Sequence, residues 1–284
     1  MSIMNRIGST FAVALLAVST VGVQHAGAQS YLMPSTPERG IWLEASHPNI
    51  KSPLEVTTPS SAWFLSGRHP VTSRISGVAE APFAYGKLDI AGLPEGDGST
   101  VFGNPYLGME FAHSDRVTLE LGARIPMTTA DEDSFGDVVG VLADPLRSEA
   151  FLEDVVPLSG AVSFRETLPV GEGATVRARG GIVTMFYTGD DEELDETTTF
   201  VDYGVTGTYP IGIARMGAGV SGRWNASESE GKFSDNSLHQ LGLSADASVR
   251  GFIRPGISLR VPLDKDYRDL VGSTVGLYVQ VSMP

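Results

Sequence analysis

An alternation of apolar and polar residues, sustained over long segments, constrains this chain more than any other feature of its sequence. From Val117 to Ile125 every second residue is apolar, and the positions between them hold Thr, Glu, Gly and Arg. The same period of two runs from Leu241 to Val249 and from Leu277 to Met283. Successive side chains of a β-strand point to opposite faces, so these segments are predicted strands that separate an apolar from a polar environment.

The connections between the predicted strands alternate in length. The pattern predicts about twelve strands, at residues 40–48, 60–69, 73–85, 103–113, 115–127, 157–168, 174–188, 198–209, 212–225, 237–249, 251–262 and 271–283. Short turns and long polar segments, such as residues 128–156, follow one another in turn. A soluble β-sandwich has no reason to sort its loops this way. The predicted fold class is all-β: a transmembrane antiparallel up-and-down β-barrel with short periplasmic turns and long extracellular loops.

The N-terminus predicts export to the cell outer membrane. A single arginine precedes an apolar run at residues 7–23, and the Ala-Gly-Ala sequence at 26–28 fits a signal peptidase site. We expect cleavage between Ala28 and Gln29, because the run is short for a membrane-anchor helix. The predicted organisation is a cleaved signal peptide at residues 1–28, an N-terminal periplasmic segment at 29–39 and the barrel at 40–284.

The composition narrows the set of partners. The formal net charge of -14 excludes a nucleic-acid partner, because phosphate backbones repel such an acidic chain. The sequence has no cysteine, so it offers no lipoprotein anchor, disulfide framework or thiolate metal site. The expected partners are outer-membrane lipid, the barrel-assembly machinery and periplasmic chaperones, with a small-molecule solute that the sequence does not identify. The expected state is a monomer.

Three glycines, Gly217, Gly219 and Gly222, have the spacing of a dinucleotide-binding fingerprint. That fingerprint needs a helix directly after the glycines, and the residues that follow are polar and lack a helical period. The alternation instead places Gly217 and Gly219 on the lumenal face of a strand, where they leave room for side chains of neighbouring strands. A nucleotide site is therefore not expected.

Charged residues of both signs are predicted to line the lumen. The alternation places there the following side chains: Glu80, Glu110, Glu120, Arg124, Arg165, Arg177, Arg179, Asp202, Arg215, Arg223, Asp246 and Arg260, together with Glu44, Arg68 and Arg74. Two interpretations remain open. The charges pair across the lumen and plug it, or they line a narrow polar path and set its ion preference. Pairing is the stronger expectation, because unpaired charges in a confined interior are costly.

No constellation of catalytic or metal-binding residues emerges from the sequence. The acidic stretch at residues 190–196 lacks the spacing of a calcium-binding loop and is interpreted as a solvated loop. The sequence from His113 to Asp115 contains the residue types of a serine-protease triad, but three adjacent residues cannot form one. We expect no catalytic residue, no metal and no cofactor.

Two segments resemble the outer-membrane transporter family named after the meta-cleavage pathway of phenol degradation. The segments are "LSGRHPVTSRISGVAEAPFAY" at 65–85 and "FGNPYLGMEF" at 102–111, and the matching residues are His69, Pro70, Thr72, Arg74, Glu80, Pro82, Gly103, Asn104 and Pro105. The chain departs from outer-membrane proteins in general at its end, where Met283 and Pro284 replace a terminal aromatic residue. The resemblance implies a barrel that passes small, often hydrophobic, solutes.

Three functions follow from these observations. The leading hypothesis is a passive channel for small solutes, hydrophobic ones included, with lumenal Arg and Glu side chains setting selectivity. The alternative is a closed structural barrel that works through its acidic extracellular loops. The third is a lipid-modifying barrel enzyme, which requires a His, a Ser and an acid close together near the outer leaflet.

Overall fold

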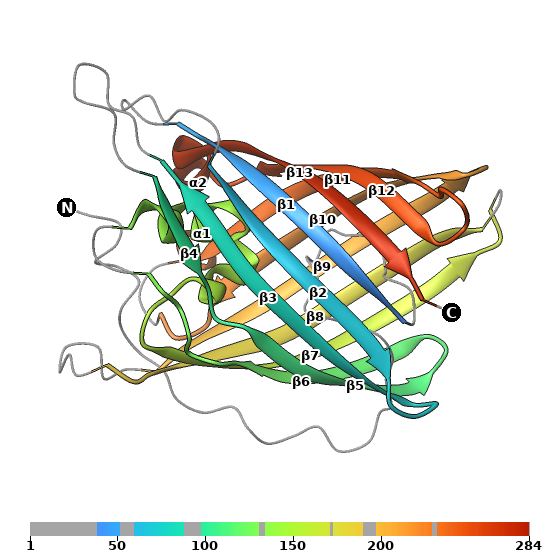
Figure 1. Cartoon of the computed structure of the whole chain (residues 1–284), viewed down its shortest axis with the longest axis horizontal. Coiled ribbons are helices and arrows are strands. Elements are labelled where there is room, and N and C mark those ends of the chain that lie inside the picture. The colour runs from blue at the N-terminus through green and yellow to red at the C-terminus, as the bar shows by residue number, and fades with distance from the viewer. Residues whose placement is uncertain are drawn as a thin grey trace.

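The computed structural model describes residues 39–51, 60–87, 98–130, 134–170, 173–189, 197–228 and 232–283. Twelve antiparallel strands form a closed barrel (Figure 1). They are β1 (Gly40–Ile50), β2 (Ser61–Pro70), β3 (Ile75–Gly86), β5 (Tyr106–Ser114), β6 (Val117–Arg124), β7 (Val155–Leu168), β8 (Ala174–Tyr187), β9 (Thr198–Ile211), β10 (Ala214–Asn225), β11 (Ser237–Ala247), β12 (Ile253–Pro262) and β13 (Val271–Ser282). The first and last strands pair, with Gly40 opposite Ser282, and this pairing closes the ring.

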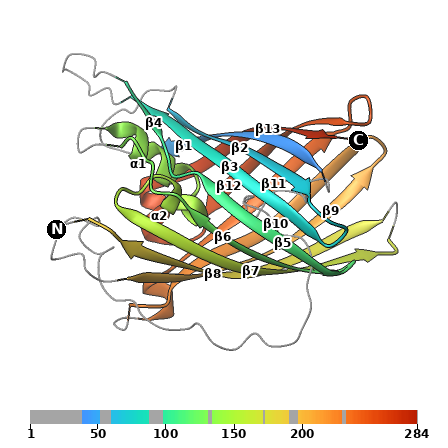
Figure 2. The same cartoon turned by 60° about the horizontal axis from the view of Figure 1, so that its bottom comes forward.

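The predicted fold class is confirmed, including the positions of the strands. Consecutive strands of the barrel are neighbours in the sheet, as an up-and-down topology requires. Short turns, such as residues 71–74 and 212–213, lie at the end of the barrel that holds the C-terminus. The longer connections between β6 and β7 and between β12 and β13 lie at the opposite end (Figure 2). By the rule for outer-membrane barrels, the short-turn end faces the periplasm and the other end faces outward.

The barrel is apolar outside and polar inside. Leu277 and Ile257 are 61% and 58% exposed on the outer face, whereas Glu44 and Glu120 are 0% and 2% exposed inside. A soluble protein buries its apolar side chains and exposes its charges, so this distribution is the reverse of a soluble core. A band of apolar side chains around a polar interior suits the hydrocarbon of a bilayer. The protein is an outer-membrane barrel.

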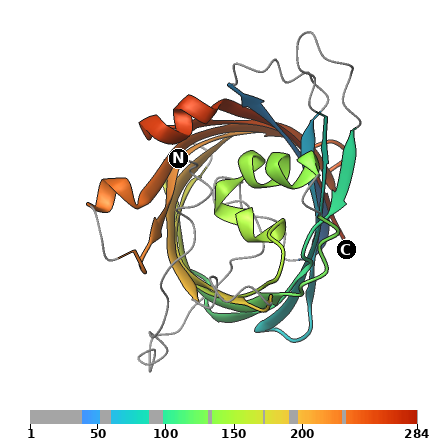
Figure 3. The same cartoon turned by 90° about the vertical axis from the view of Figure 1, so that its left-hand side faces the viewer.

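The connection between β6 and β7 differs from the extracellular loop that the sequence predicts. It contains a helix, α1 (Phe135–Ala143), and a 3-10 helix, η2 (Pro145–Ala150). Both lie within the ring of strands (Figure 3). The reason is apolar burial: Ala143 and Ala150 join Phe151 in a cluster with Phe64 of β2, and the two phenyl rings meet edge-on at 5.9 Å. We call residues 135–150 the lumenal segment.

Three smaller elements lie outside this pattern. A short strand, β4 (Ser99–Phe102), extends the sheet beside β3. Two short helices, η4 (Phe233–Asp235) and α2 (Lys265–Leu270), follow β10 and β12 at the long-loop end. No helix in the described ranges is long and apolar enough to cross a membrane.

Several predictions fall on residues that the structure does not describe. These are the signal peptide with its Ala28–Gln29 cleavage site, most of the 29–39 segment, and the acidic stretch at 190–196. The glycine prediction can be compared with the structure. A Cβ on Gly217 would collide with the Ser244 side chain, and one on Gly219 with Thr206. The two glycines therefore make room for neighbouring side chains, although these are short rather than the long ones expected.

Candidate functional site

The second helix of the lumenal segment, η2, has a well-defined start. Asp144 precedes η2, and its carboxylate accepts a hydrogen bond from the backbone N–H of Leu146 at 3.3 Å. Pro145 occupies the first helical position, where its missing N–H costs nothing. The short helix that follows holds Arg147 and Glu149, which are 4% and 6% exposed. This half of the segment thus carries three buried charged side chains, Asp144, Arg147 and Glu149, into the lumen.

Arg147 connects the lumenal segment to two barrel strands. Its Nη2 lies 2.6 Å from Glu44 on β1, and its Nη1 lies 3.1 Å from Glu80 on β3. Its Nε reaches Asp144 at 2.8 Å, and its guanidinium stacks 3.5 Å from the centre of the Phe64 ring. One planar cation therefore satisfies three carboxylates and covers an aromatic face, which a lysine ammonium cannot do.

Two further arginines balance these carboxylates. Arg260 on β12 forms ion pairs with Glu44 and with Asp144, the latter at 3.2 Å, and donates to the carbonyl oxygen of Ala143 at 2.9 Å. Arg124 on β6 lies 2.8 Å from Glu80. The three carboxylates of Glu44, Glu80 and Asp144 are thus matched by three guanidinium groups. Such matching is the condition under which buried charges are tolerated.

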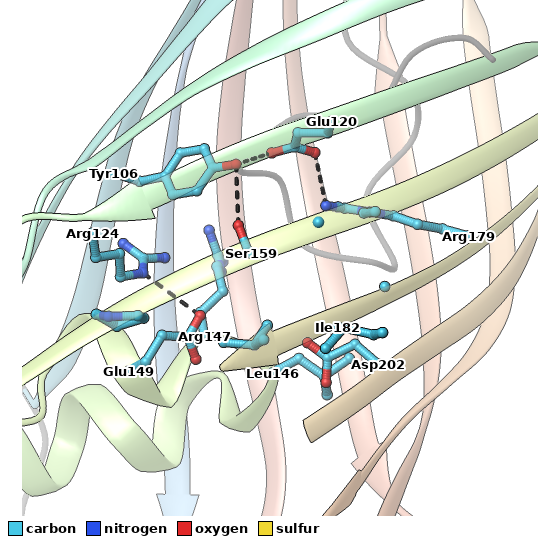
Figure 4. Close-up of a pocket in the computed structure, with 15 residues that line it drawn as sticks. Tyr106, Glu120, Arg124, Leu146, Arg147, Glu149, Ser159, Arg179, Ile182 and Asp202 are labelled. Carbon is cyan, nitrogen blue, oxygen red and sulfur yellow. Dashed lines mark hydrogen bonds and ion pairs between the residues drawn. The ribbon is translucent and has the colours of Figure 1, made fainter. Parts of the chain in front are cut away.

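Glu149 anchors the other end of the segment. Its carboxylate lies 3.0 Å from Arg223 on β10 and 3.6 Å from Arg124. Arg223 also forms a two-point contact with Asp202 on β9, at 2.6 and 2.7 Å, and donates to the carbonyl oxygen of Leu146 at 2.8 Å. Figure 4 shows Arg124 of β6 joined to Glu149 of the lumenal segment.

Asn104 holds the chain on both sides of the segment. Its side-chain Nδ2 donates to the carbonyl oxygens of Glu149 and Leu152 at 3.2 and 2.7 Å. Its Oδ1 accepts from the backbone N–H groups of Met127 and Thr128 at 2.9 and 3.0 Å. This residue belongs to the Gly-Asn-Pro motif of the sequence, and its side chain uses all four hydrogen-bonding positions of an amide.

The ion-pair partners of the lumenal segment stabilise the charged forms of its side chains. Burial opposes the charge of Asp144, but Arg260 and Arg147 outweigh it and hold the pKa of that carboxyl below its usual value. Burial likewise opposes the charge of Glu149, and Arg223 and Arg124 lower its pKa. For Arg147, burial is outweighed by Glu44, Asp144 and Glu80, which raise its pKa. All three groups are charged at neutral pH.

Further charged groups line the lumen toward the periplasm. Glu120 accepts a hydrogen bond from Tyr106 and lies 2.9 Å from Arg179, as Figure 4 shows. A cavity of about 50 Å³ lies between this group and the lumenal segment, with Asp202 in its wall. Water needs roughly 10–15 Å³ on this measure, so the cavity has room for a few molecules among polar partners. The polar lining therefore continues below the segment.

The predicted lumenal residues fall into three groups. The network around the lumenal segment contains Glu80, Arg124, Asp202, Arg223 and Arg260. Glu110, Glu120, Arg179, Arg215 and Asp246 form ion pairs deeper in the barrel; Arg68 is the partner of Glu110. Arg177 is buried, whereas Arg165 is exposed near the short turns.

Sequence reasoning missed the residues of the lumenal segment itself, together with Arg254, which lies 2.5 Å from Asp246. One signal was present in the sequence. The stretch "FGDVVGVLADPLRSEAF" is apolar and helical in period, with Pro145 near its centre, and solvated loops are rarely so apolar.

Comparison with known proteins supports the fold. No family model matches the sequence, and no curated protein matches it. Among solved structures, an outer membrane channel from Pseudomonas putida F1 aligns with a TM-score of 0.57 and 12% identity, over 89% of this chain and 98% of the other. LpxR from Salmonella typhimurium aligns with a TM-score of 0.54 and 12% identity, over 86% and 100%. At such identities the likeness shows the outer-membrane barrel fold alone.

Proposed function

We propose that the protein is a passive channel for small solutes and that the lumenal segment narrows its outer end. The observation that carries the proposal is the way this segment is held. Its polar anchors are the ion pairs of Asp144, Arg147 and Glu149, placed above a lumen whose lining stays polar toward the periplasm. A water-filled path needs such a lining, and a segment held by side-chain contacts can set its width.

The proposed selectivity residues are the lumenal charges named from the sequence. Arg177 and Arg179 are the preferred candidates, because both lie on β8 with their side chains directed to the interior, below the lumenal segment. The charged lining favours small polar or ionic solutes over the hydrophobic ones that the family resemblance implies. Membership of that transporter family is part of the proposal, and it rests on the short motifs around Glu80 and Asn104.

One observation favours the alternative of a closed barrel. The network around the lumenal segment is dense. Two or more carboxylate or carbonyl groups accept hydrogen bonds from each of three arginines, Arg147, Arg223 and Arg260. A network of this kind also suits a permanent plug. The proposal also includes a monomeric state, outer-membrane lipid and the assembly machinery as partners, and a role without catalysis or cofactors.

Planar-bilayer conductance of the refolded protein distinguishes the open channel from the closed barrel. The informative variant is Arg147→Met, which leaves Glu44, Glu80 and Asp144 with one cation fewer and loosens the segment. We expect discrete conductance steps for the natural sequence and larger steps for the variant. Removing one partner of a buried ion pair costs about 3–5 kcal/mol, so folding must be checked by the heat-dependent shift of the gel band.

Arg116→Gln is the matched control, because Arg116 forms an exposed ion pair with Glu166 near the periplasmic turns. It should leave the step size unchanged. If folded protein of both the natural sequence and the Arg147→Met variant conducts no ions, the channel proposal is wrong and the closed barrel replaces it.

A further inference from the structure

A polar group of three residues lies on the outer wall of the barrel. The Tyr203 hydroxyl is 2.6 Å from Nε2 of His239, and Nδ1 of His239 is 3.0 Å from a carboxylate oxygen of Asp264. The backbone N–H of His239 also donates to Asp264. We call Tyr203, His239 and Asp264 the outer relay. None of the contacts described for the lumenal segment involves it.

Strand register puts the outer relay on the lipid-facing side. Gly222 of β10 lies opposite both Tyr203 of β9 and His239 of β11. Tyr203 alternates with the lumenal Asp202 and shares its face with Val205, which is 54% exposed. The Tyr203 ring lies over Gly222, where an added Cβ would come within 2.7 Å of it. Only glycine at this position lets the tyrosine reach the histidine across an intervening strand.

The relay lies at the level of the outer head groups. Asp264 precedes α2, and η4 contributes Phe233, whose ring is 6.1 Å from that of His239 and 5.7 Å from that of Trp224. Both helices lie outside the ring of strands at the long-loop end (Figure 3). Aromatic side chains gather where a barrel meets the membrane interface.

An apolar groove begins at Tyr203 and runs over the wall of the barrel. It has a volume of about 490 Å³ and is lined by Val162, Phe164, Ala178, Gly180, Val205 and Val220 as well as Tyr203. The groove is hollow because β8 contributes only Ala178 and Gly180 between larger side chains, and a Cβ on Gly180 would meet nothing within 4 Å. Its volume is within the roughly 300–1,000 Å³ of small-molecule sites, and its walls belong to the lipid-facing surface.

The hydrogen bonds of the relay define the head group that fits it. A carboxylate only accepts, so Nδ1 of His239 carries the proton that faces Asp264. In the neutral imidazole Nε2 then accepts from the Tyr203 hydroxyl. The hydroxyl oxygen keeps its acceptor positions for a donor from the ligand, such as an amide N–H or a hydroxyl. Lys232 and Lys265 are both exposed, but each has an aspartate close by, Asp235 and Asp266, so the rim carries no excess of positive charge.

We propose that the groove and the outer relay bind one molecule of lipopolysaccharide from the outer leaflet. One acyl chain lies in the groove, and an amide or hydroxyl donor of the lipid meets Tyr203. The membrane face of the groove, its place at the outward end and the acceptor positions of the Tyr203 hydroxyl favour this lipid, which carries amide and hydroxyl donors on its acyl chains, over a phospholipid. The site is independent of the proposed channel.

The test measures binding of a deep-rough lipopolysaccharide to delipidated, refolded protein by native mass spectrometry. Gly180→Leu fills the groove, and we expect it to abolish saturable binding. Tyr203→Phe removes the hydroxyl, and we expect about fivefold weaker binding from the loss of one hydrogen bond. The matched control is Gly207→Leu, since Gly207 lies on the same outer face, has nothing within 4 Å of an added Cβ and does not line the groove.

Three results would overturn the proposal. They are unchanged binding in Gly180→Leu and Tyr203→Phe, equal loss in Gly207→Leu, or displacement of the lipopolysaccharide by an equimolar amount of phosphatidylethanolamine. The heat-dependent gel shift establishes that each variant is folded. Bilayer conductance of Gly180→Leu should match that of the natural sequence, so failure of the lipid site and failure of the channel are told apart.

Discussion

At the scale of single residues, the interior is organised by side chains that serve several partners at once. Arg147 faces three carboxylates, and Asn104 makes four hydrogen bonds to backbone groups on both sides of the lumenal segment. A buried polar atom that loses its partner costs about 1–3 kcal/mol, so one such side chain has a large effect. The effect of substituting one of these side chains therefore depends more on how many partners it serves than on its charge.

Asn104→Ala should release the lumenal segment without removing a charge. The change leaves the carbonyl oxygens of Glu149 and Leu152 and two backbone N–H groups without their side-chain partner. We expect faster cleavage by an added protease between residues 125 and 154, on a barrel that still shows its gel shift. Asn225→Ala is the control, because Asn225 accepts only a local bond from Ser227. Equal cleavage of both variants would contradict the assigned role of Asn104.

At the scale of elements, the lumenal segment is held by groups that titrate in acid. The pKa values of Asp144 and Glu149 are lowered from ordinary values of 3.8 and 4.5. A lowered pKa in the docked state means that the carboxylates stabilise docking fully above their ordinary values. This contribution is lost as the pH falls through those values toward the lower pKa values of the docked state.

The expected outcome is a conductance that stays constant from pH 7 to about pH 5 and rises below about pH 4 as the segment undocks. The step size is measured while both chambers are acidified. Glu149→Gln should already show larger steps at pH 7, because Arg223 and Arg124 lose an anionic partner. Steps that remain unchanged down to pH 3 in a folded barrel would rule out electrostatic docking.

Prediction from sequence succeeded where the physics is local and failed where it depends on the curvature of the closed ring. The alternation around Val117–Ile125 fixes a strand and its faces without reference to other strands. Arg223 and Asp202 are direct cross-strand neighbours, so assigning the register would have paired them. The contact between Glu44 and Arg147 spans 103 residues and joins the barrel wall to the lumenal segment, and no local pattern encodes it. The outer relay could not be predicted for the same reason, since it joins β9, β11 and the connection that follows β12.

At the scale of the whole molecule, charge is distributed unevenly between the lumen and the exterior. Arg177 and Arg179 lie on the inner face of β8 and, with Arg68, face the two carboxylates of Glu110 and Glu120. This group therefore holds one cation in excess, while the chain as a whole carries a net charge of -14. A local excess of positive charge in a confined space attracts anions more strongly than the exterior does. The lumen and not the overall charge should therefore set ion preference.

Exchange of both arginines for glutamine should shift the reversal potential in a KCl gradient toward cations. The control, Arg116→Gln with Arg250→Gln, removes the same number of charges from exposed positions at the short-turn end. We expect the control to keep the ion preference of the natural sequence. Identical reversal potentials for the two double variants would place the selective charges elsewhere.

The seam between β1 and β13 joins the first and last strands of the barrel, so it forms only when the last strand is in place. Glu44 lies on one side of this seam and Arg260 on the other, and both meet the lumenal segment. During assembly the segment therefore cannot complete its contacts on an open sheet. The lumenal segment therefore docks only when the ring closes. A barrel that stops before this step differs from the finished protein, because its β6–β7 connection is undocked and its lumenal carboxylates lack their arginine partners.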